Sequence, residues 1–199
     1  EKPDGQFPTV KSPNPENPES LDLAKKYADK IGSDLVLATD PDADRLAFSF
    51  RLKDGKWFNP TGHMQAILLT HYILSSLTDH NKLPQKPFLA KTIVTTDLLT
   101  VLGKHYGCDM HETLTGFKWI AKMIEDYPDE KFLGGGEESF GFMVGDFVRD
   151  KDAVTAALLA CEVASTALSN GESFFDQLLK AYKAFGLYQE KLISFVKKG

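Results

Sequence analysis

The stretch LVLATDPDADRLAFSF, residues 35–50, sets an acidic loop between two apolar runs. Each run has the composition of a strand. Between them Asp40, Asp42 and Asp44 alternate with other residues, and Arg45 follows at once. Carboxylates this close repel one another, so a free loop of this kind loses stability unless a cation offsets the charge.

A hard divalent cation removes this repulsion. Mg²⁺ prefers oxygen ligands and is usually held by a few carboxylates together with phosphate or water. In an extended loop the side chains at i, i+2 and i+4 point the same way, which predicts that the three aspartates converge on one Mg²⁺ ion. A calcium loop of the EF-hand kind is excluded, because Arg45 stands where that loop has glycine and strands flank the segment. The alternative is a solvated turn with three exposed acids.

Composition narrows the class of protein. The 199 residues suit one large domain or one and a half ordinary ones. A net charge of −5 gives no support to a nucleic-acid partner, and no apolar run approaches the length of about 18 residues that a membrane span needs. The two cysteines form no CxxC pair and no secretory signal is present, which favours a cytoplasmic protein. The proline-rich start without a methionine favours an excised piece of a longer protein.

The remaining sequence alternates helical and strand patterns. Helices are expected over residues 18–31, 62–78, 97–107, 116–127, 151–168 and 173–186. Strands are expected over 34–39, 45–52, 88–96, 108–113 and 131–135, with a tight hairpin turn at 53–56. This order predicts an α/β fold with a mixed or mainly parallel sheet between helices, and a partial second α/β subdomain. The boundary between the two parts is expected between Gly55 and Pro60.

Several motifs in order carry a family resemblance. The loop TDPDADR, residues 39–45, resembles the metal loop of the α-D-phosphohexomutase superfamily, the phosphoglucomutase and phosphomannomutase enzymes. TLTGFKWI (113–120) is similar to a loop before a helix in their third domain, and GGEESFGF (135–142) resembles their sugar-binding loop. RDKDAVTAALLACE (149–162) and DGQFPTVKSPNPENPESL (4–21) also match segments of these enzymes.

The resemblance implies a middle fragment of a four-domain enzyme. Residues 1–56 are expected to be the end of domain 2, residues 57–190 domain 3, and residues 191–199 the start of a linker to a missing domain 4. We find no Ser-His-Asn-Pro-like loop and no SGTEP-like loop in this sequence. The nucleophilic serine and the main phosphate anchor are therefore expected in domains 1 and 4 of the same parent chain.

The resemblance also implies an activity. These enzymes interconvert sugar 1-phosphates and 6-phosphates through a phosphoserine and a bisphosphate, with glucose or mannose phosphate as partner. By resemblance the three aspartates are the Mg²⁺ ligands and Arg45 lies beside the phosphoryl group, where a dication and a guanidinium neutralise charge. Glu137 and Ser139 match the contacts to sugar hydroxyls, and the fragment alone is expected to be inactive.

Further site residues are predicted with alternatives. Thr115 and Gly116 lie in the loop expected at the substrate, and Lys118 is a hypothetical general acid or base, or else a helix-surface lysine. Lys91 lies in a strand, where burying a charge is costly, so it either meets substrate phosphate at the strand's end or occupies an edge. Arg149 and Lys151 rank below these as cleft charges. By resemblance, Glu138 favours glucose or mannose phosphates over glucosamine phosphate.

Three other functions remain open at this point. A phosphopentomutase or another phosphosugar mutase would share the same motifs. A non-catalytic module that binds sugar phosphate or a cation is a second alternative. A phosphotransferase with Asp40 as nucleophile, of the haloacid dehalogenase kind, is a third, although Asp44 stands where those enzymes have threonine or valine.

Overall fold

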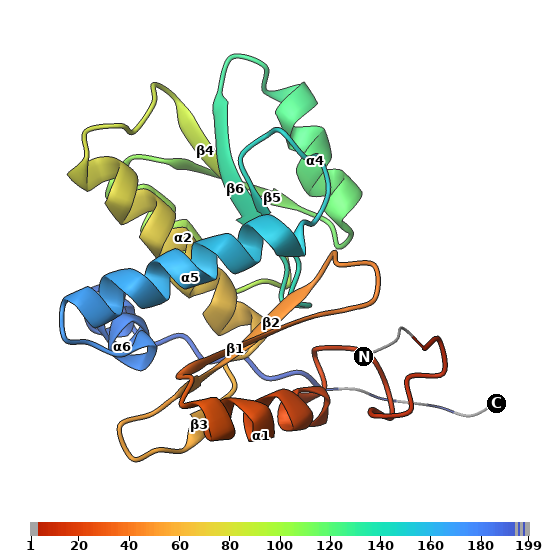
Figure 1. The fold of residues 1–199 in the computed structure, drawn as a ribbon. Helices are drawn as coiled ribbons and strands as arrows, with labels where there is room; N and C mark the ends of the chain where they lie inside the picture. The colour runs from red at the N-terminus through yellow and green to blue at the C-terminus, as the bar shows by residue number, and fades with distance from the viewer. Residues whose placement is uncertain (1–3, 194, 196, 198–199) are drawn as a thin grey trace.

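The computed structural model describes residues 4–193, 195 and 197, and Figure 1 shows two sheets with helices packed around them. The elements in chain order are η1 (Pro18–Leu21), α1 (Asp22–Ile31), β1 (Leu35–Thr39), β2 (Leu46–Arg51), β3 (Trp57–Phe58), α2 (Gly62–Asp79), β4 (Pro87–Thr92), α3 (Leu98–Tyr106), β5 (Asp109–Thr113), α4 (Phe117–Asp126), β6 (Lys131–Gly136), β7 (Phe142–Val144), α5 (Ala153–Ser169) and α6 (Phe174–Phe185).

The larger sheet confirms the α/β prediction. Its strand order is β5-β4-β6-β7, in which the first three strands are parallel and β7 is antiparallel. Alternate residues of β4 enter different cores: Phe88 and Ala90 pack with Phe117 of α4, whereas Leu89 joins the cluster of α2, α3 and α5. The sheet is therefore covered on both faces, which a parallel sheet requires.

The smaller sheet is an antiparallel meander in the order β1-β2-β3. Every residue of β2 except the last is buried, because α1 covers one face and helices of the larger unit cover the other. On the second face Phe174 of α6 lies 5.0 Å from Phe48 and 5.1 Å from Phe50, measured between ring centroids. The two sheets thus share one hydrophobic core.

Some predicted boundaries are wrong. The strand expected over residues 88–96 ends at Thr92, because the amide of Thr95 bonds the carbonyl of Thr92 and turns the chain. The bounds of the helix expected over 18–31 are right, but its first turn, Pro18–Leu21, is a 3₁₀ helix. The helix expected from residue 151 begins at Ala153, where the Asp152 side chain accepts the amide of Val154.

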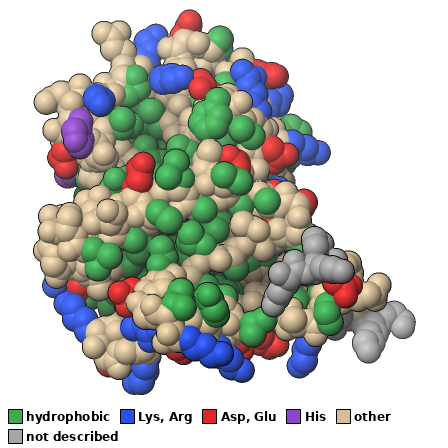
Figure 2. All heavy atoms as spheres, viewed as in Figure 1, with side chains coloured by type: hydrophobic (Ala, Val, Ile, Leu, Met, Phe, Trp, Pro, Cys, Tyr) green, Lys and Arg blue, Asp and Glu red, His purple; other side chains and the backbone are tan. Residues whose placement is uncertain are grey.

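Helix α5 is apolar almost all round, yet only part of it is buried. One face packs into the core, while Val154, Leu158 and Leu168 are exposed on the other. Figure 2 shows hydrophobic side chains gathered across the face on which α5 lies in Figure 1. Within the part of the chain that the structure describes, no single helix is long and apolar enough to cross a membrane, although α5 and α6, bent by 89°, pass that test as a pair.

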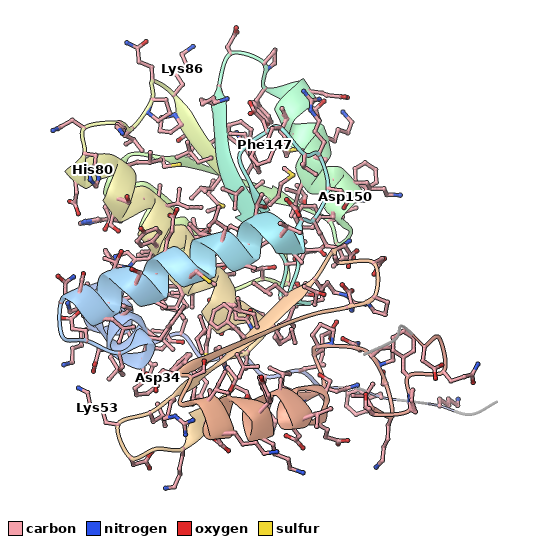
Figure 3. All side chains as sticks on the ribbon, viewed as in Figure 1. Asp34, Lys53, His80, Lys86, Phe147 and Asp150 are labelled. Atoms are coloured by element: carbon pink, nitrogen blue, oxygen red, sulfur yellow. The ribbon has the colours of Figure 1, made fainter. Side chains whose placement is uncertain are left out.

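The parallel strands bring three loops to one edge. The carboxyl ends of β4, β5 and β6 lead into the turn 92–97, the loop 114–116 and the turn 137–141. Open α/β sheets bind ligands at this edge. The other edge carries Lys86, which Figure 3 labels with His80 far from the smaller sheet.

Gly62, the first residue of α2, fixes the turn 137–141 from behind. A Cβ atom at this position would lie 1.8 Å from the carbonyl oxygen of Glu138, closer than any real contact allows. The backbone of α2 therefore touches the backbone of the turn directly.

Replacing Gly62 with alanine should destabilise the protein by about 1–3 kcal/mol or more, the range of overpacked cores. At a helical position with free space around it, the same change would stabilise the protein by up to about 1 kcal/mol. The sign of the change in the free energy of unfolding therefore shows whether Gly62 packs against Glu138. Urea unfolding measures the difference. Gly5→Ala is the control, because a Cβ there meets no atom within 4 Å; equal stability of the two variants would contradict the prediction.

Candidate active site

The acidic loop is a turn, not the extended segment that the sequence predicts. The amide of Ala43 bonds the carbonyl of Asp40 at 3.1 Å, and Ala43 has a left-handed φ of 55°. Even so the three carboxylates lie together as predicted, whereas their binding of Mg²⁺ stays a prediction. Each of Asp40, Asp42 and Asp44 offers one carboxylate oxygen such that all three oxygens lie within 4.8 Å of one another. The turn, rather than strand alternation, gathers them.

Asp40 holds the turn together. Its side chain is buried, its Oδ1 accepts the amides of Asp44 at 3.1 Å and Arg45 at 3.0 Å, and its Oδ2 accepts Nε of Arg45 at 2.7 Å. Burial pushes the pKa of Asp40 up, but the hydrogen bonds and charge of Arg45 outweigh burial and hold the pKa below its ordinary value. Asp40 is therefore an ionised carboxylate at neutral pH.

Asp44 provides the sign that a further cation fits here. Its Oδ2 lies 2.9 Å from Nζ of Lys151, whereas its buried Oδ1 accepts no hydrogen bond and lies 3.6 Å from Nε of Arg45. Burial raises the pKa of Asp44, against the opposing hydrogen bond from Lys151. Asp42 is exposed on the same turn. A buried carboxylate oxygen that accepts no hydrogen bond, beside two further carboxylates, fits a hard cation such as Mg²⁺.

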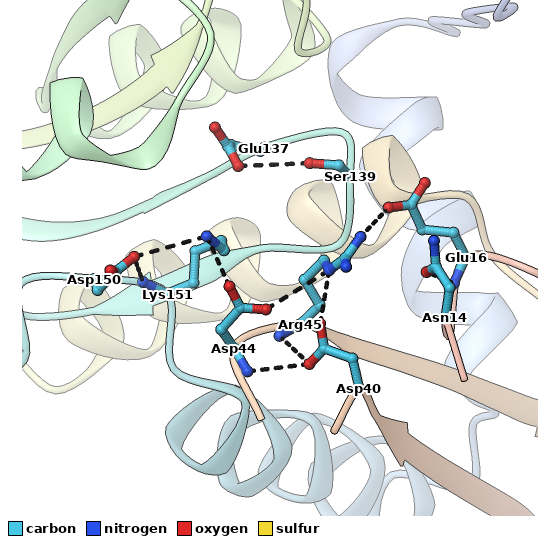
Figure 4. A network of polar contacts seen from close by, with 9 residues as sticks. All are labelled: Asn14, Glu16, Asp40, Asp44, Arg45, Glu137, Ser139, Asp150 and Lys151. Carbon is cyan, nitrogen blue, oxygen red and sulfur yellow. Dashed lines mark hydrogen bonds and ion pairs between the residues drawn. The ribbon is translucent and has the colours of Figure 1, made fainter. Parts of the chain in front are cut away.

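Arg45 is fixed between two carboxylates. Besides Asp40, its Nη1 contacts Oε1 of Glu16 at 2.6 Å, and Figure 4 shows Glu16 reaching in from the proline-rich segment. Sequence analysis missed Glu16, because nothing in the spacing of residues 4–21 relates it to Arg45. The pair explains why this irregular segment keeps its place beside the acidic loop.

The turn 137–141 places Glu137 and Ser139 on the same side. The amide of Glu137 bonds the carbonyl of Gly141 at 2.9 Å, and the carboxylate of Glu137 accepts the amide of Gly116 at 3.1 Å. Oγ of Ser139 lies 3.5 Å from the other oxygen of Glu137. Glu137 is buried, and this burial raises the pKa of its carboxyl.

The acidic loop and the turn 137–141 are joined directly. The amide of Leu46 bonds the carbonyl of Phe140 at 3.1 Å, and Arg45 forms a β-bridge with Gly141. Lys151 also spans the two, since its ammonium meets Asp44 while its stem lies against Gly141, where a Cβ would come within 2.3 Å. Figure 3 shows its neighbour Asp150 on the connection between β7 and α5.

Lys151 contacts both parts of the site, although the sequence favoured it less than Lys91 and Lys118 as a site residue. Burial lowers the pKa of Lys151, but the hydrogen bond and charge of Asp44, with Asp150 and Glu137, outweigh burial and raise the pKa. The ammonium also lies 5.5 Å from the ring centroid of Phe117. Its position next to Asp152, the cap of α5, is the sequence signal that indicates a fixed backbone here.

The two other predicted lysines do not reach this group. Lys118 is exposed, and its ammonium lies 5.1 Å from the ring centroid of Trp119. Lys91 is one residue from the end of β4, which is an inner strand, so the edge alternative is wrong. Its ammonium is 0% exposed and contacts Glu112 and Asp97 at 2.9 and 3.0 Å.

A pocket of about 930 Å³ adjoins the site without containing it. Its lining includes Thr115, Glu138 and Ser139 together with residues of the segments 15–21 and 190–193. Neither Glu137 nor the three aspartates line this pocket. The converging charged groups therefore define the site, and the pocket is its neighbouring volume.

The family model for phosphoglucomutase/phosphomannomutase, alpha/beta/alpha domain III, matches residues 61–184, and the model for domain II matches residues 1–53. The chain belongs to the phosphoglucomutase/phosphomannomutase family. It is 37% identical to a phosphomannomutase of Mycoplasmoides pirum over 96% of this chain and 35% of the relative. It is 34% identical to a human phosphopentomutase over 98% of this chain and 33% of the relative.

Solved structures agree with the family fold. The crystal structure of a phosphomannomutase candidate from Thermus thermophilus matches with a TM-score of 0.65 and 26% identity, covering 86% of this chain and 36% of the other. This chain therefore spans about a third of the length of the family members it matches. Membership of this family removes support from the haloacid dehalogenase alternative, and both oxygens of Asp40 are already engaged by Arg45 and backbone amides.

Replacing Glu137 with glutamine should raise the free energy of unfolding at pH 7. Burial raises the pKa of Glu137, so the folded protein bears a cost for the ionised carboxyl that a neutral amide avoids. The gain should vanish as the pH falls below the ordinary value of 4.5, where Glu137 is protonated in both states.

Urea unfolding at pH 7 and pH 4 measures this difference. The control is Glu162→Gln on the exposed side of α5, which should change the free energy of unfolding little at either pH. A Glu137→Gln variant that is less stable than the parent at pH 7 would show that burial does not dominate at this carboxyl.

Proposed function

We propose that this chain forms the metal-binding and sugar-binding part of a Mg²⁺-dependent phosphosugar mutase. The reaction interconverts sugar 1-phosphate and 6-phosphate through a phosphoserine and a bisphosphate. The observation that carries the proposal is the convergence of Asp40, Asp42 and Asp44 in a turn bonded to the loop of Glu137 and Ser139. The three aspartates suit a dication, and the neighbouring Glu137 and Ser139 suit sugar hydroxyls.

The site has more negative than positive side chains, so it can accept a phosphate group only with a dication bound. Two cations, Arg45 and Lys151, lie among six carboxylates, those of Glu16, Asp40, Asp42, Asp44, Glu137 and Asp150. A phosphate group would be repelled by such an excess. In our proposal the aspartates hold Mg²⁺, which supplies positive charge against the phosphoryl group when bound.

The chain's own residues then orient the reactants. Arg45 is held by Asp40 and Glu16, so its guanidinium keeps one direction toward the phosphoryl group. Glu137 accepts hydrogen bonds from sugar hydroxyls, and Ser139 donates or accepts one. Lys151 keeps its proton, since Asp44 holds its ammonium in the charged form. Lys118 stays a prediction for the general acid or base, and Thr115 and Gly116 stay predicted substrate contacts.

The sugar is the finer part of the proposal. We propose glucose or mannose phosphate, the sugars implied by the resemblance of the loop GGEESFGF. A pentose phosphate is the second candidate, and similarity to a human phosphopentomutase at 34% identity favours it. A non-catalytic sugar-phosphate module is the remaining alternative.

The rest of the enzyme lies in other segments in this proposal. No serine loop of the family's kind is found in residues 1–199, so domains 1 and 4 of a parent chain supply the nucleophile and the phosphate anchor. We also propose a cytoplasmic location, since Cys108 and Cys161 are both free thiols and a reducing compartment preserves them.

Asp42→Asn in the full-length protein should weaken Mg²⁺ binding by about tenfold or more, since one of three anionic ligands becomes neutral. Asp42 is exposed and does not hold the turn, so the fold should be kept. Titration calorimetry measures the affinity. Asp129→Asn, on the exposed segment before β6, is the control and should bind as the parent does; unchanged binding by Asp42→Asn would remove this residue from the metal site.

The full-length protein should convert glucose 1-phosphate or mannose 1-phosphate to the 6-phosphate in the presence of Mg²⁺ and a catalytic bisphosphate. Residues 1–199 alone should show no turnover, because they contain no matching serine nucleophile. A coupled assay with ribose 1-phosphate in parallel decides between hexose and pentose. Binding of all three sugars without turnover by the full-length protein would support the non-catalytic module instead.

A further inference from the structure

Glu138 lies between two predicted sugar contacts but makes a contact of its own elsewhere. Its Oε2 accepts the hydroxyl of Thr92 at 3.2 Å and the hydroxyl of Thr95 at 3.1 Å. Both threonines are buried, 0% and 2% exposed, in the turn that follows β4. The neighbours Glu137 and Ser139 bond to each other instead, and Glu137 also to the loop before α4.

The hydroxyls of Thr92 and Thr95 need a hydrogen-bond acceptor from Glu138. The two hydroxyl oxygens are 2.8 Å apart, so with Oε2 of Glu138 they form three contacts with only two hydroxyl hydrogens to serve them. A side chain that accepts without donating completes this arrangement. A carboxylate oxygen does so, and an amide oxygen does so equally, whereas with an apolar side chain one hydroxyl can donate to the other and the second is left without an acceptor.

Lys91 holds the threonine turn from beneath. Its buried ammonium donates to the carbonyl of Thr95 at 3.1 Å and to Oδ1 of Asp97 at 3.0 Å, so it fixes both ends of the segment 95–97. It also meets Glu112 on β5 at 2.9 Å. A charged group this deep is stable only when its donors are satisfied, and these partners satisfy all three.

A second contact acts on the same residue from the other side. The backbone of Glu138 touches Gly62 at the start of α2, and the ring nitrogen Nδ1 of His63 next to it accepts the amide of Thr96 at 3.2 Å. The turn 92–97, the first turn of α2 and Glu138 thus form one packed unit under the sugar loop.

We propose that Glu138 is a positioning residue, and that the hydroxyls of Thr92 and Thr95 hold its carboxylate so that Glu137 and Ser139 face the acidic loop. Lys91 acts one step further away, by fixing the turn that carries the hydroxyls. This rests on the proposed function, because the loop that is positioned is the one assigned to the sugar. The new claim is that the hydrogen bonds between the turn 92–97 and Glu138 fix the turn 137–141.

The rival role for Glu138 is direct contact with substrate, which its place in the pocket wall would permit. The two roles give opposite results in matched variants of the full-length protein. Thr92→Val/Thr95→Val removes both hydroxyls and keeps the side-chain shape. Glu138→Gln keeps an acceptor oxygen for the hydroxyls but removes the charge that a substrate contact would use.

For positioning, Thr92→Val/Thr95→Val should raise KM for the sugar phosphate by about tenfold, the size of one lost hydrogen bond to a charged group, with a smaller effect on kcat. Glu138→Gln should stay within about twofold of the parent. Thr92→Ser/Thr95→Ser, which keeps both hydroxyls, should restore the parent KM. A raised KM in Glu138→Gln together with a parent-like valine variant would overturn the proposal in favour of substrate contact.

A readout independent of activity separates this proposal from the proposed function. The amide of Glu137 bonds the carbonyl of Gly141 within the turn 137–141, and the amide of Leu46 bonds the carbonyl of Phe140 in the same turn. Hydrogen exchange at these two amides should speed up about tenfold in the valine variant and not in the serine variant. Unchanged exchange in the valine variant would refute the link even if the protein is an active mutase. If the double variant does not fold, Thr95→Val alone carries the same test.

If the full-length protein has no mutase activity, the proposed function fails while the exchange measurement still decides whether the threonine pair positions the loop. If it is active and the valine variant behaves like the parent in both KM and exchange, the positioning role fails while the proposed function stands.

Discussion

The hydrogen bond between the amide of Leu46 and the carbonyl of Phe140 fixes the relation between the two halves of the candidate active site. Leu46 begins β2 in the smaller sheet, and Phe140 lies in the turn between β6 and β7 of the larger one. Because this contact joins backbones, it sets the distance between the acidic loop and Glu137 without depending on a flexible side chain. The shared aromatic core beneath, formed by Phe48, Phe50 and Phe174, keeps the two sheets from moving apart. The site is therefore as rigid as the junction between the sheets.

Electrostatics at this junction leave an excess of negative charge. Arg45 and Lys151 each sit between carboxylates, which keeps both side chains charged and oriented but does not balance the acids around them. Oδ1 of Asp44, which is buried and accepts no hydrogen bond, is the local sign of that excess. Burial opposes ionisation of Glu137 and Asp44, whereas Arg45 favours ionisation of Asp40. The pKa values of these neighbouring carboxylates thus shift in different directions, because Asp40 accepts hydrogen bonds from Arg45 and backbone amides whereas burial dominates at Asp44.

The loops at the carboxyl edge of the larger sheet depend on one another. The turn 92–97 is fixed by a buried lysine, the turn 137–141 rests on it through Glu138, and the loop before α4 meets Glu137 through the amide of Gly116. Each contact uses a buried donor or acceptor whose loss would leave its partner unsatisfied. The family match assigns these segments to one domain, and the structure explains why that domain needs β2 of the preceding one to complete its core.

The sequence alone determined the alternation of helices and strands, the mixed sheet, the aspartate cluster and the family, because hydrophobic period and short motifs are local properties of the chain. It did not determine that the cluster forms through a turn at Ala43, since a left-handed alanine has no local signature. Nor did it reveal Glu16 beside Arg45 or Lys151 beside Asp44, because these pairs join residues at least 29 positions apart. Lys91 shows the same limit: the sequence left its place open between a strand's end and an edge, and only the fold supplied Asp97 and Glu112 as partners that make its burial stable.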